Sequence, residues 1–231
     1  LTGAPADVIA IDGKTLRRSY QKRGAKAPIH MVSAFAARQR LVLGQVKVAE
    51  KSNEIIAIPA LLAMMAIEGA IVTIDAAGCQ VANAEIIRSR GGHYLLAVKD
   101  NQPTLRAAVE RVVGAACEAD FLGVAMDGDE ATDDAHGRHE ERYVTVIGAP
   151  EGIPADWPDV AAVVEVDRER EVGGKRTVTT HYYLSSYAGT AADLGRWAEH
   201  ELQVVPLRQA LEPLGDMADE AELLRRINTE I

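Results

Sequence analysis

The chain has 231 residues, of which 48% are hydrophobic and 26% charged, and its net charge is −9. This length supports one sizeable core or two small ones, and the mean hydropathy of −0.05 is typical of a soluble globular protein. No stretch approaches the roughly 18 apolar residues of a membrane span, and the first residues lack the regions of a signal peptide, so we expect a cytoplasmic protein. Leu1 in place of methionine indicates a fragment or an unusual start. Cys79 and Cys117 are too few for a disulfide framework or a zinc cluster, and we expect two reduced, buried thiols.

Charge is divided unevenly along the chain. Residues 1–118 hold 15 Lys and Arg against 10 Asp and Glu, a net charge of +5. Subtraction from the totals of 25 and 34 leaves 10 against 24, or −14, for residues 119–231. The basic residues are densest between 14 and 26. A solvated loop is the ordinary explanation of such a run, but its place directly after Asp12 also suits the binding of phosphate groups.

The first half of the chain alternates strand and helix patterns. Residues 7–12 form the first expected strand, and residues 29–37 and 41–48 form a hairpin. An apolar stretch at 55–67 predicts a helix that Ser52 or Asn53 can cap, followed by a strand at 70–75. A helix from 81, a strand at 93–98 and a helix from 103 complete the order β, β, β, α, β, α, β, α. This order predicts an α/β fold with a mixed sheet flanked by helices.

The composition changes after residue 118. Residues 127–134 are interpreted as an acidic loop, and strand-like runs follow at about 142–148, 160–167 and 177–186. These runs predict an antiparallel β insertion before the last helices, which begin near residue 191. We therefore divide the chain into residues 1–118, the first part of the core; residues 119–187, the β-rich insertion; and residues 188–231, the C-terminal helices that complete the core.

Two aspartates follow apolar strands. Asp12 comes directly after residues 8–11, and Asp75 directly after residues 71–74. Because α/β folds place functional side chains at the carboxyl ends of buried strands, the two carboxylates meet if these strands are neighbours. Such a pair indicates either a raised pKa or a bound divalent cation, with Mg²⁺ or Mn²⁺ favoured by oxygen ligands. Two such ions can drive phosphodiester transfer. Capping of a turn, common for Asp before Gly, explains each residue equally well.

Six short motifs occur in order between about residues 7 and 190: IDGKTLRRS at 11–19, EKSNEI at 50–55, VTIDAAGCQ at 72–80, YLLAVKDNQ at 94–102, HGRHEER at 136–142 and YYLSS at 182–186. Together they resemble the DDE transposases of bacterial insertion sequences, specifically the H-repeat-associated group. The resemblance implies an RNase H-like catalytic domain in which Asp12 and Asp75 are the first two acidic catalytic residues and bind magnesium or manganese. It implies metal-dependent DNA cleavage at the ends of the element and strand transfer of the freed 3′ hydroxyl to target DNA, with a homodimer as a family expectation.

The resemblance also suggests where DNA phosphates would lie. Contacts of this kind position DNA without reading its sequence. His136 is better suited to a phosphate than to a metal, since no third ligand accompanies His136 and His139, although an ordinary solvated turn explains it as well. We expect DNA contacts from residues that follow the two aspartates and from the turn of the insertion: Lys14, Arg17, Arg18, Lys99, Asn101, Gln102, His136 and Arg138.

The third carboxylate departs from the family pattern. The family places a Glu in a segment resembling His-Trp-x-Ile-Glu-Asn, whereas residues 196–206 are RWAEHELQVVP. Alignment on Trp197 puts His200 at the position of the Glu. Glu199 and Glu201, on either side, are both candidates for the third catalytic residue, and Glu201 for the metal ligand. Because the tail at 222–227 matches the family again, a local frameshift between about 198 and 218 is indicated.

Three functions stay open. The chain is an active DDE transposase domain, or an inactive transposase remnant that keeps the fold and at most binds DNA or partners, or a metal-dependent nuclease of the same fold. Catalytic turnover separates the second function from the others, and joining of the cleaved strand separates the first from the third.

Overall fold

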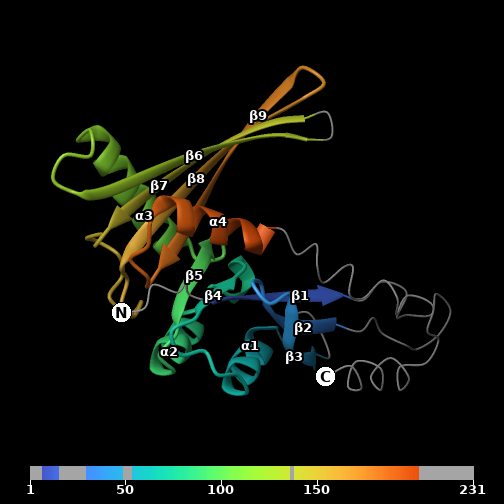
Figure 1. The fold of residues 1–231 in the computed structure, drawn as a ribbon. Coiled ribbons are helices and arrows are strands. Elements are labelled where there is room, and N and C mark those ends of the chain that lie inside the picture. The colour runs from blue at the N-terminus through green and yellow to red at the C-terminus, as the bar shows by residue number, and fades with distance from the viewer. Residues whose placement is uncertain (1–6, 16–29, 49–53, 136–137, 203–231) are drawn as a thin grey trace.

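The computed structural model describes residues 7–15, 30–48, 54–135 and 138–202. They form one nine-stranded sheet with the strand order β3-β2-β1-β4-β5-β9-β8-β7-β6 and helices on both faces (Figure 1). In chain order the elements are β1 (Val8–Thr15), β2 (His30–Ala36), β3 (Leu41–Val48), α1 (Glu54–Ala63), β4 (Ile71–Ile74), the short 3₁₀ helix η2 (Ala76–Gly78), α2 (Val81–Ser89), β5 (His93–Val98), α3 (Pro103–Glu118), β6 (Ala125–Ala135), β7 (Arg138–Gly148), β8 (Ala162–Val172), β9 (Lys175–Ser185) and α4 (Ala191–Leu202).

The first half of the sheet has the RNase H-like arrangement. β1, β2 and β3 form an antiparallel meander, and β4 pairs with β1, and β5 with β4, in parallel. The order β, β, β, α, β, α, β, α predicted for this half is confirmed, and β5 has the predicted bounds. β4 is buried at every position, as its run of β-branched residues leads one to expect for a central parallel strand.

The antiparallel insertion is also confirmed, and it extends the same sheet instead of forming a separate one. β9 pairs with β5, and β8, β7 and β6 follow in antiparallel order. Gly173 and Gly174, with φ of +58° and +77°, supply the left-handed turn that joins β8 to β9. The outer halves of these long strands project beyond the helices (Figure 1).

The predicted acidic loop at 127–134 is wrong, because these residues lie in β6. All eleven residues of β6 pair with β7. The sequence shows no apolar alternation here since β6 is the last strand of the sheet and most of its side chains face solvent. Acidic side chains suit such an edge, because they discourage pairing with another chain.

Helices cover the sheet unequally. One face packs on α1, α2 and α3 through a large apolar cluster that includes Leu61, Ile87 and Val109. The other face packs on α4 through a smaller cluster that includes Leu194 and Trp197. Trp157 and Trp197 are both buried and belong to the core. Cys79 is buried, but Cys117 is exposed, contrary to expectation, because α3 turns Val113 and Ala116 toward the sheet and Cys117 away from it. Within the described residues, no helix has the length and apolar character needed to span a bilayer.

Candidate active site

Asp12 and Asp75 occupy neighbouring positions on two parallel strands. β1 and β4 pair from Val8 opposite Ile71 to Ile11 opposite Ile74, so the next position on each chain is an aspartate. Neighbouring strands lie roughly 4.8 Å apart, and residues at matching positions point to the same face. Val8 and Ile71, which share that face, pack in the cluster with α4. The structure therefore brings two half-buried carboxylates together on the face of the sheet that α4 covers.

Asp75 also caps the turn that follows it. Its Oδ1 accepts a hydrogen bond from the backbone N–H of Gly78 at 3.2 Å, and its backbone is extended, with φ −64° and ψ 173°. A carboxylate has two oxygens and about four lone-pair sites, so this bond leaves it able to bind a cation. Turn capping and a catalytic role, which are alternatives in the sequence, are compatible in the structure.

Asn101 and Gln102 lie between β5 and α3 and reach back to the same turn. The side-chain amide of Asn101 donates to the carbonyl of Ala76 at 2.6 Å, and that of Gln102 donates to the carbonyl of Cys79 at 2.8 Å. Asn83, which the sequence did not single out, donates to the carbonyl of Gly78 at 2.8 Å. Its position in the first turn of a helix gave no signal of this contact.

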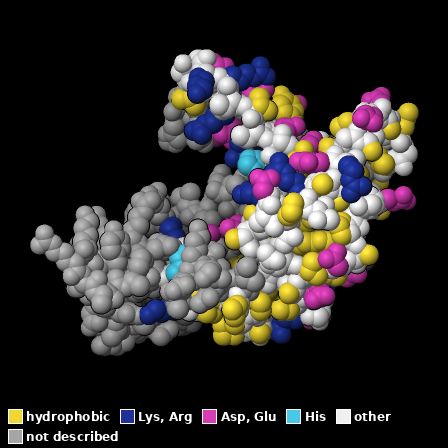
Figure 2. Space-filling model, turned by 180° about the vertical axis from the view of Figure 1, so that it is seen from behind, with side chains coloured by type: hydrophobic (Ala, Val, Ile, Leu, Met, Phe, Trp, Pro, Cys, Tyr) yellow, Lys and Arg dark blue, Asp and Glu magenta, His cyan; other side chains and the backbone are white. Residues whose placement is uncertain are grey.

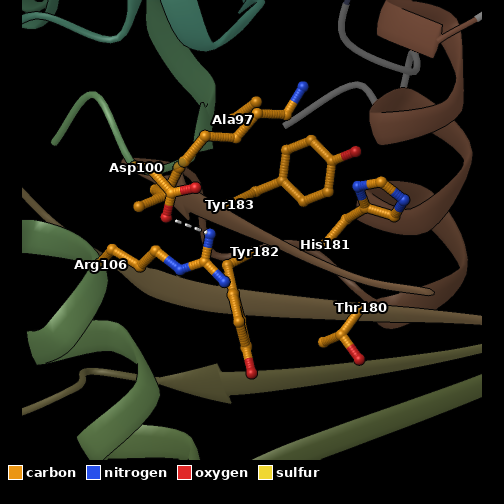
Figure 3. A pocket seen from close by; sticks show the side chains of 9 residues that line it. Ala97, Asp100, Arg106, Thr180, His181, Tyr182 and Tyr183 are labelled. Atoms are coloured by element: carbon orange, nitrogen blue, oxygen red, sulfur yellow. Dashed lines mark hydrogen bonds and ion pairs between the residues drawn. The ribbon is translucent and has the colours of Figure 1, made fainter. Parts of the chain in front are cut away.

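A pocket of about 210 Å³ opens where β5 ends beside β9, one strand from Asp75 and two strands from Asp12. Ala97, in this lining, occupies the position on β5 next to Asp75. Figure 3 shows Arg106 and Asp100 on one side of the pocket and Tyr183 and His181 on the other. Lys99 also lines it and is exposed.

Lys99 brings a positive charge to the side of the pocket that His181 also lines. Arg106 is compensated by Asp100 and Glu110, each at 2.8 Å. Burial lowers the pKa of His181, and the nearby charges of Arg168 and Lys99 lower it further. Figure 2 shows basic, histidine and acidic side chains gathered in the hollow between the outer halves of β6–β9 and the rest of the sheet. His181 precedes the YYLSS motif directly, but only the pairing of β9 with β5 brings it beside Lys99.

Burial also raises the pKa of Tyr182, in the same pocket, to about 12, with Glu165 as the next cause. Tyr182 therefore keeps its proton at neutral pH.

α4 begins at the far edge of the sheet and runs toward the carboxylates. The N–H of Ala191 donates to Oδ2 of Asp127 on β6 at 2.7 Å. The strand register places Asp127 in the same row across the sheet as Asp75. Five strand spacings, roughly 24 Å, separate β6 from β4, whereas twelve helical residues rise about 18 Å. Because α4 also contacts β1 and β4, its last turns are the part that lies near Asp12 and Asp75.

The remaining predicted site residues are described only in part. Lys14 lies in β1 and is half-buried. Glu199 and Glu201 belong to α4, and Arg138 begins β7, but their side chains lie outside the described residues, as do Arg17, Arg18 and His136 altogether. His139, the neighbour of that turn, contacts Asp134 at 2.6 Å and Glu141 at 3.2 Å.

The donor set at the strand ends fits a hard divalent cation. Asp12 and Asp75 supply carboxylate oxygens, which Mg²⁺ and Mn²⁺ prefer, and a cation offsets the repulsion between the two negative charges. Among the side chains that the structure describes, no group of three His, Cys, Asp or Glu could hold a metal ion.

Comparisons with known proteins agree on one family. The chain matches the family described as "Transposase DDE domain" over residues 3–195. It is 40% identical over 192 residues to the "H repeat-associated putative transposase YhhI" of Escherichia coli K12, covering 80% of this chain and 50% of that protein. It is 45% identical over 147 residues to YbfD, given the same description in the same organism, covering 64% of this chain and 57% of YbfD. The chain thus spans about half the length of the curated relatives it matches.

Among solved structures, the piggyBac transposase synaptic complex with hairpin DNA has a TM-score of 0.48 and 9% identity, covering 90% of this chain and 41% of that one. That likeness is too distant to transfer any residue of its active site.

Proposed function

Because this chain belongs to the transposase DDE domain family, we propose that it is the catalytic domain of a transposase that cleaves and joins DNA with bound divalent metal. The neighbouring positions of Asp12 and Asp75 carry the proposal. The paired strands fix both backbones, which holds the two carboxylates at neighbouring positions where they could share a cation. We expect the domain to act on DNA in the bacterial cytoplasm.

In this proposal Asp12, Asp75 and a third carboxylate hold magnesium or manganese. When bound, the metal would lower the pKa of a water molecule or hydroxyl and stabilise the leaving oxygen. In the first step a water oxygen bonds to the phosphorus and the bond to the 3′ oxygen breaks, which frees a 3′ hydroxyl. In the second step this hydroxyl bonds to a phosphorus of target DNA and the target's own 3′ oxygen leaves.

Helical periodicity favours Glu201 over Glu199 as the third carboxylate. Two turns of α-helix span about seven residues, so positions seven apart lie on nearly the same side. Position 201 follows Leu194, which is fully buried against the sheet, by seven residues. Position 199 follows Ala192, which is exposed, by the same interval. From this periodicity we expect position 201 on the side of the helix that faces the sheet and position 199 on its outer side.

The basic side of the pocket extends the proposed path of DNA. Lys99 and His181 both line the pocket, and an approaching phosphate would favour the protonated form of His181, which burial and the charges of Arg168 and Lys99 disfavour. Lys14, Arg17 and Arg18 follow Asp12, so we propose that they hold DNA phosphates on the side of the two carboxylates opposite the pocket. His136 and Arg138 remain proposed contacts at the turn of the insertion.

The test uses the purified chain, supercoiled plasmid DNA and MnCl₂. We expect nicking by the unmodified chain and by the Glu199→Gln variant, and none by the Asp12→Asn, Asp75→Asn and Glu201→Gln variants. Circular dichroism should show that the fold is kept. Nicking that survives in Asp75→Asn would remove Asp75 from the site, and equal activity of the two glutamate variants would remove the assignment of Glu201.

Two alternatives predict different products. The unusual sequence around Trp197 makes an inactive remnant the second candidate. Such a remnant would nick no DNA and bind no Mn²⁺. A nuclease of the same fold would nick DNA without joining a labelled 3′ end to a second duplex. Strand transfer products therefore distinguish the transposase from both.

A further inference from the structure

The turn that follows Asp75 is held by side-chain amides. Of the four consecutive carbonyl groups at 76–79, three accept a hydrogen bond from an Asn or Gln side chain: Ala76 from Asn101 at 2.6 Å, Gly78 from Asn83 at 2.8 Å and Cys79 from Gln102 at 2.8 Å. The carbonyl of Ala76 also accepts from the backbone N–H of Cys79 at 3.2 Å, so the amides add to the bonds that the turn makes by itself.

The three amides come from two separate parts of the chain. Asn83 lies in the first turn of α2 and is 1% exposed. Gln102 precedes α3, and its own carbonyl accepts from the N–H of Arg106 at 2.8 Å, so it moves with that helix. The turn is thereby tied to the beginnings of both helices that follow the central parallel strands.

The underside of the turn has no free space. A Cβ atom on Gly78 would lie 2.3 Å from Cγ2 of Ile74 and 2.8 Å from Cδ1 of Ile58. The turn therefore rests directly on β4 and α1, while the amides hold it from the other directions. Since the N–H of Gly78 bonds to Oδ1 of Asp75, the turn also orients the carboxylate.

Neutral donors suit this place better than charged ones. A lysine or arginine bonded to the same carbonyls would place a positive charge next to Asp75 and compete with a cation for it. An amide gives up to two hydrogen bonds and adds no charge. Gln102 also reaches Oε1 of Gln80 at 3.2 Å, which extends the set of neutral contacts.

We propose that Asn83, Asn101 and Gln102 are positioning residues that orient Asp75 for metal binding by holding the turn at residues 76–79. The inference rests on the proposed function in that it assigns Asp75 to the metal. It also gives Asn101 and Gln102 a role besides contact with DNA, because each already donates a hydrogen bond to the protein backbone.

The test replaces the donors with apolar side chains of similar size. The variants are Asn101→Leu, Gln102→Met and the double variant, and Thr104→Ala is the control, since Thr104 is exposed at the start of the same helix. Asn83 is left intact because it is buried. We measure hydrogen exchange of the amides at 76–79, Mn²⁺ affinity by calorimetry, DNA affinity without metal, and the midpoint of thermal unfolding.

Losing one hydrogen bond to the turn should speed the exchange of the amides at 76–79 by about 5- to 10-fold and weaken Mn²⁺ binding by about 5- to 10-fold. Both effects should be larger in the double variant. DNA affinity should stay unchanged, and Thr104→Ala should behave as the unmodified chain. Unchanged exchange in the double variant would overturn the inference, as would weaker DNA binding with unchanged Mn²⁺ affinity. If the unmodified chain binds no Mn²⁺, the proposed function fails, whereas the exchange measurement still decides whether the amides hold the turn.

Discussion

Asp127 links the far edge of the sheet to the helix that approaches the candidate active site. Its Oδ2 accepts from the N–H of Ala191, one of the helical donors that has no partner within α4. Thr190 caps the same end locally, since its hydroxyl oxygen accepts from the N–H of Asp193 at 3.2 Å. Replacing Asp127 by alanine removes the contact that spans the sheet and leaves the local cap in place.

Known capping energies set the size of the effect. Loss of a capping acceptor costs about 0.5–2 kcal/mol, and loss of a negative charge at an exposed helix N-terminus costs about 0.3–1 kcal/mol. Asp127 is exposed, so the lower parts of these ranges apply and Asp127→Ala should cost about 1–1.5 kcal/mol. At about 2–4 °C per kcal/mol for a chain of this size, the midpoint of thermal unfolding should fall by about 2–6 °C.

Asp127→Asn is the matched control, because it keeps an oxygen acceptor and removes only the charge. Its midpoint should fall by about 1–3 °C by the same conversion. Scanning calorimetry of both variants and of Thr190→Ala measures these shifts. The reasoning is refuted if Asp127→Ala unfolds at the same temperature as the unmodified chain, or if the asparagine variant is as unstable as the alanine variant.

Three further predictions concern the site and its surroundings. Replacing Arg17 and Arg18 by alanine should weaken DNA binding and reduce the slope of log affinity against log salt by about 0.9 for each lost phosphate contact; an unchanged slope in a filter-binding titration would place the DNA elsewhere. Gly78→Ala should lower the free energy of unfolding by about 1–3 kcal/mol because its Cβ would overlap Ile74 and Ile58. Gly114→Ala, in open space within α3, should instead raise it by about 0.5–1 kcal/mol, and urea titrations that rank the two otherwise would contradict the packing. His181 has a lowered pKa in the folded chain, chiefly through burial and then through Arg168 and Lys99, so the unfolded chain binds the proton more readily. Stability should therefore fall as the pH falls through about 6.5, the pKa of histidine in the unfolded chain. His181→Gln should remove that part of the pH dependence, which urea titrations at about pH 5.5 and 7.5 measure. An equal change of stability between the two pH values in both proteins would exclude His181 as its source.

Much of the fold was predictable because the first half of the chain follows local rules. The strand at 93–98 and the hairpin at 30–48 carry apolar patterns of the right length, and Gly91 marks the end of α2, whereas the helix predicted at 55–67 ends at Ala63, well before Gly69. β6 shows where such rules fail. Its acidic residues have no strand pattern of their own, and they are extended because β7 supplies hydrogen-bond partners along their whole length.

For the candidate site, the sequence by itself determined which residues can act: an aspartate after each of two apolar strands, a set of ordered motifs, and two glutamates near Trp197. Only the tertiary structure decided which of them meet. Asp12 and Asp75 are 63 positions apart and become neighbours through the register of β1 with β4. His181 joins Lys99 through the pairing of β9 with β5, and the amides of Asn101 and Gln102 turn back to the loop after Asp75. The physical reason is that side-chain chemistry and periodicity are local properties of the chain, whereas strand pairing and packing join segments whose separation in sequence carries no record of their contact.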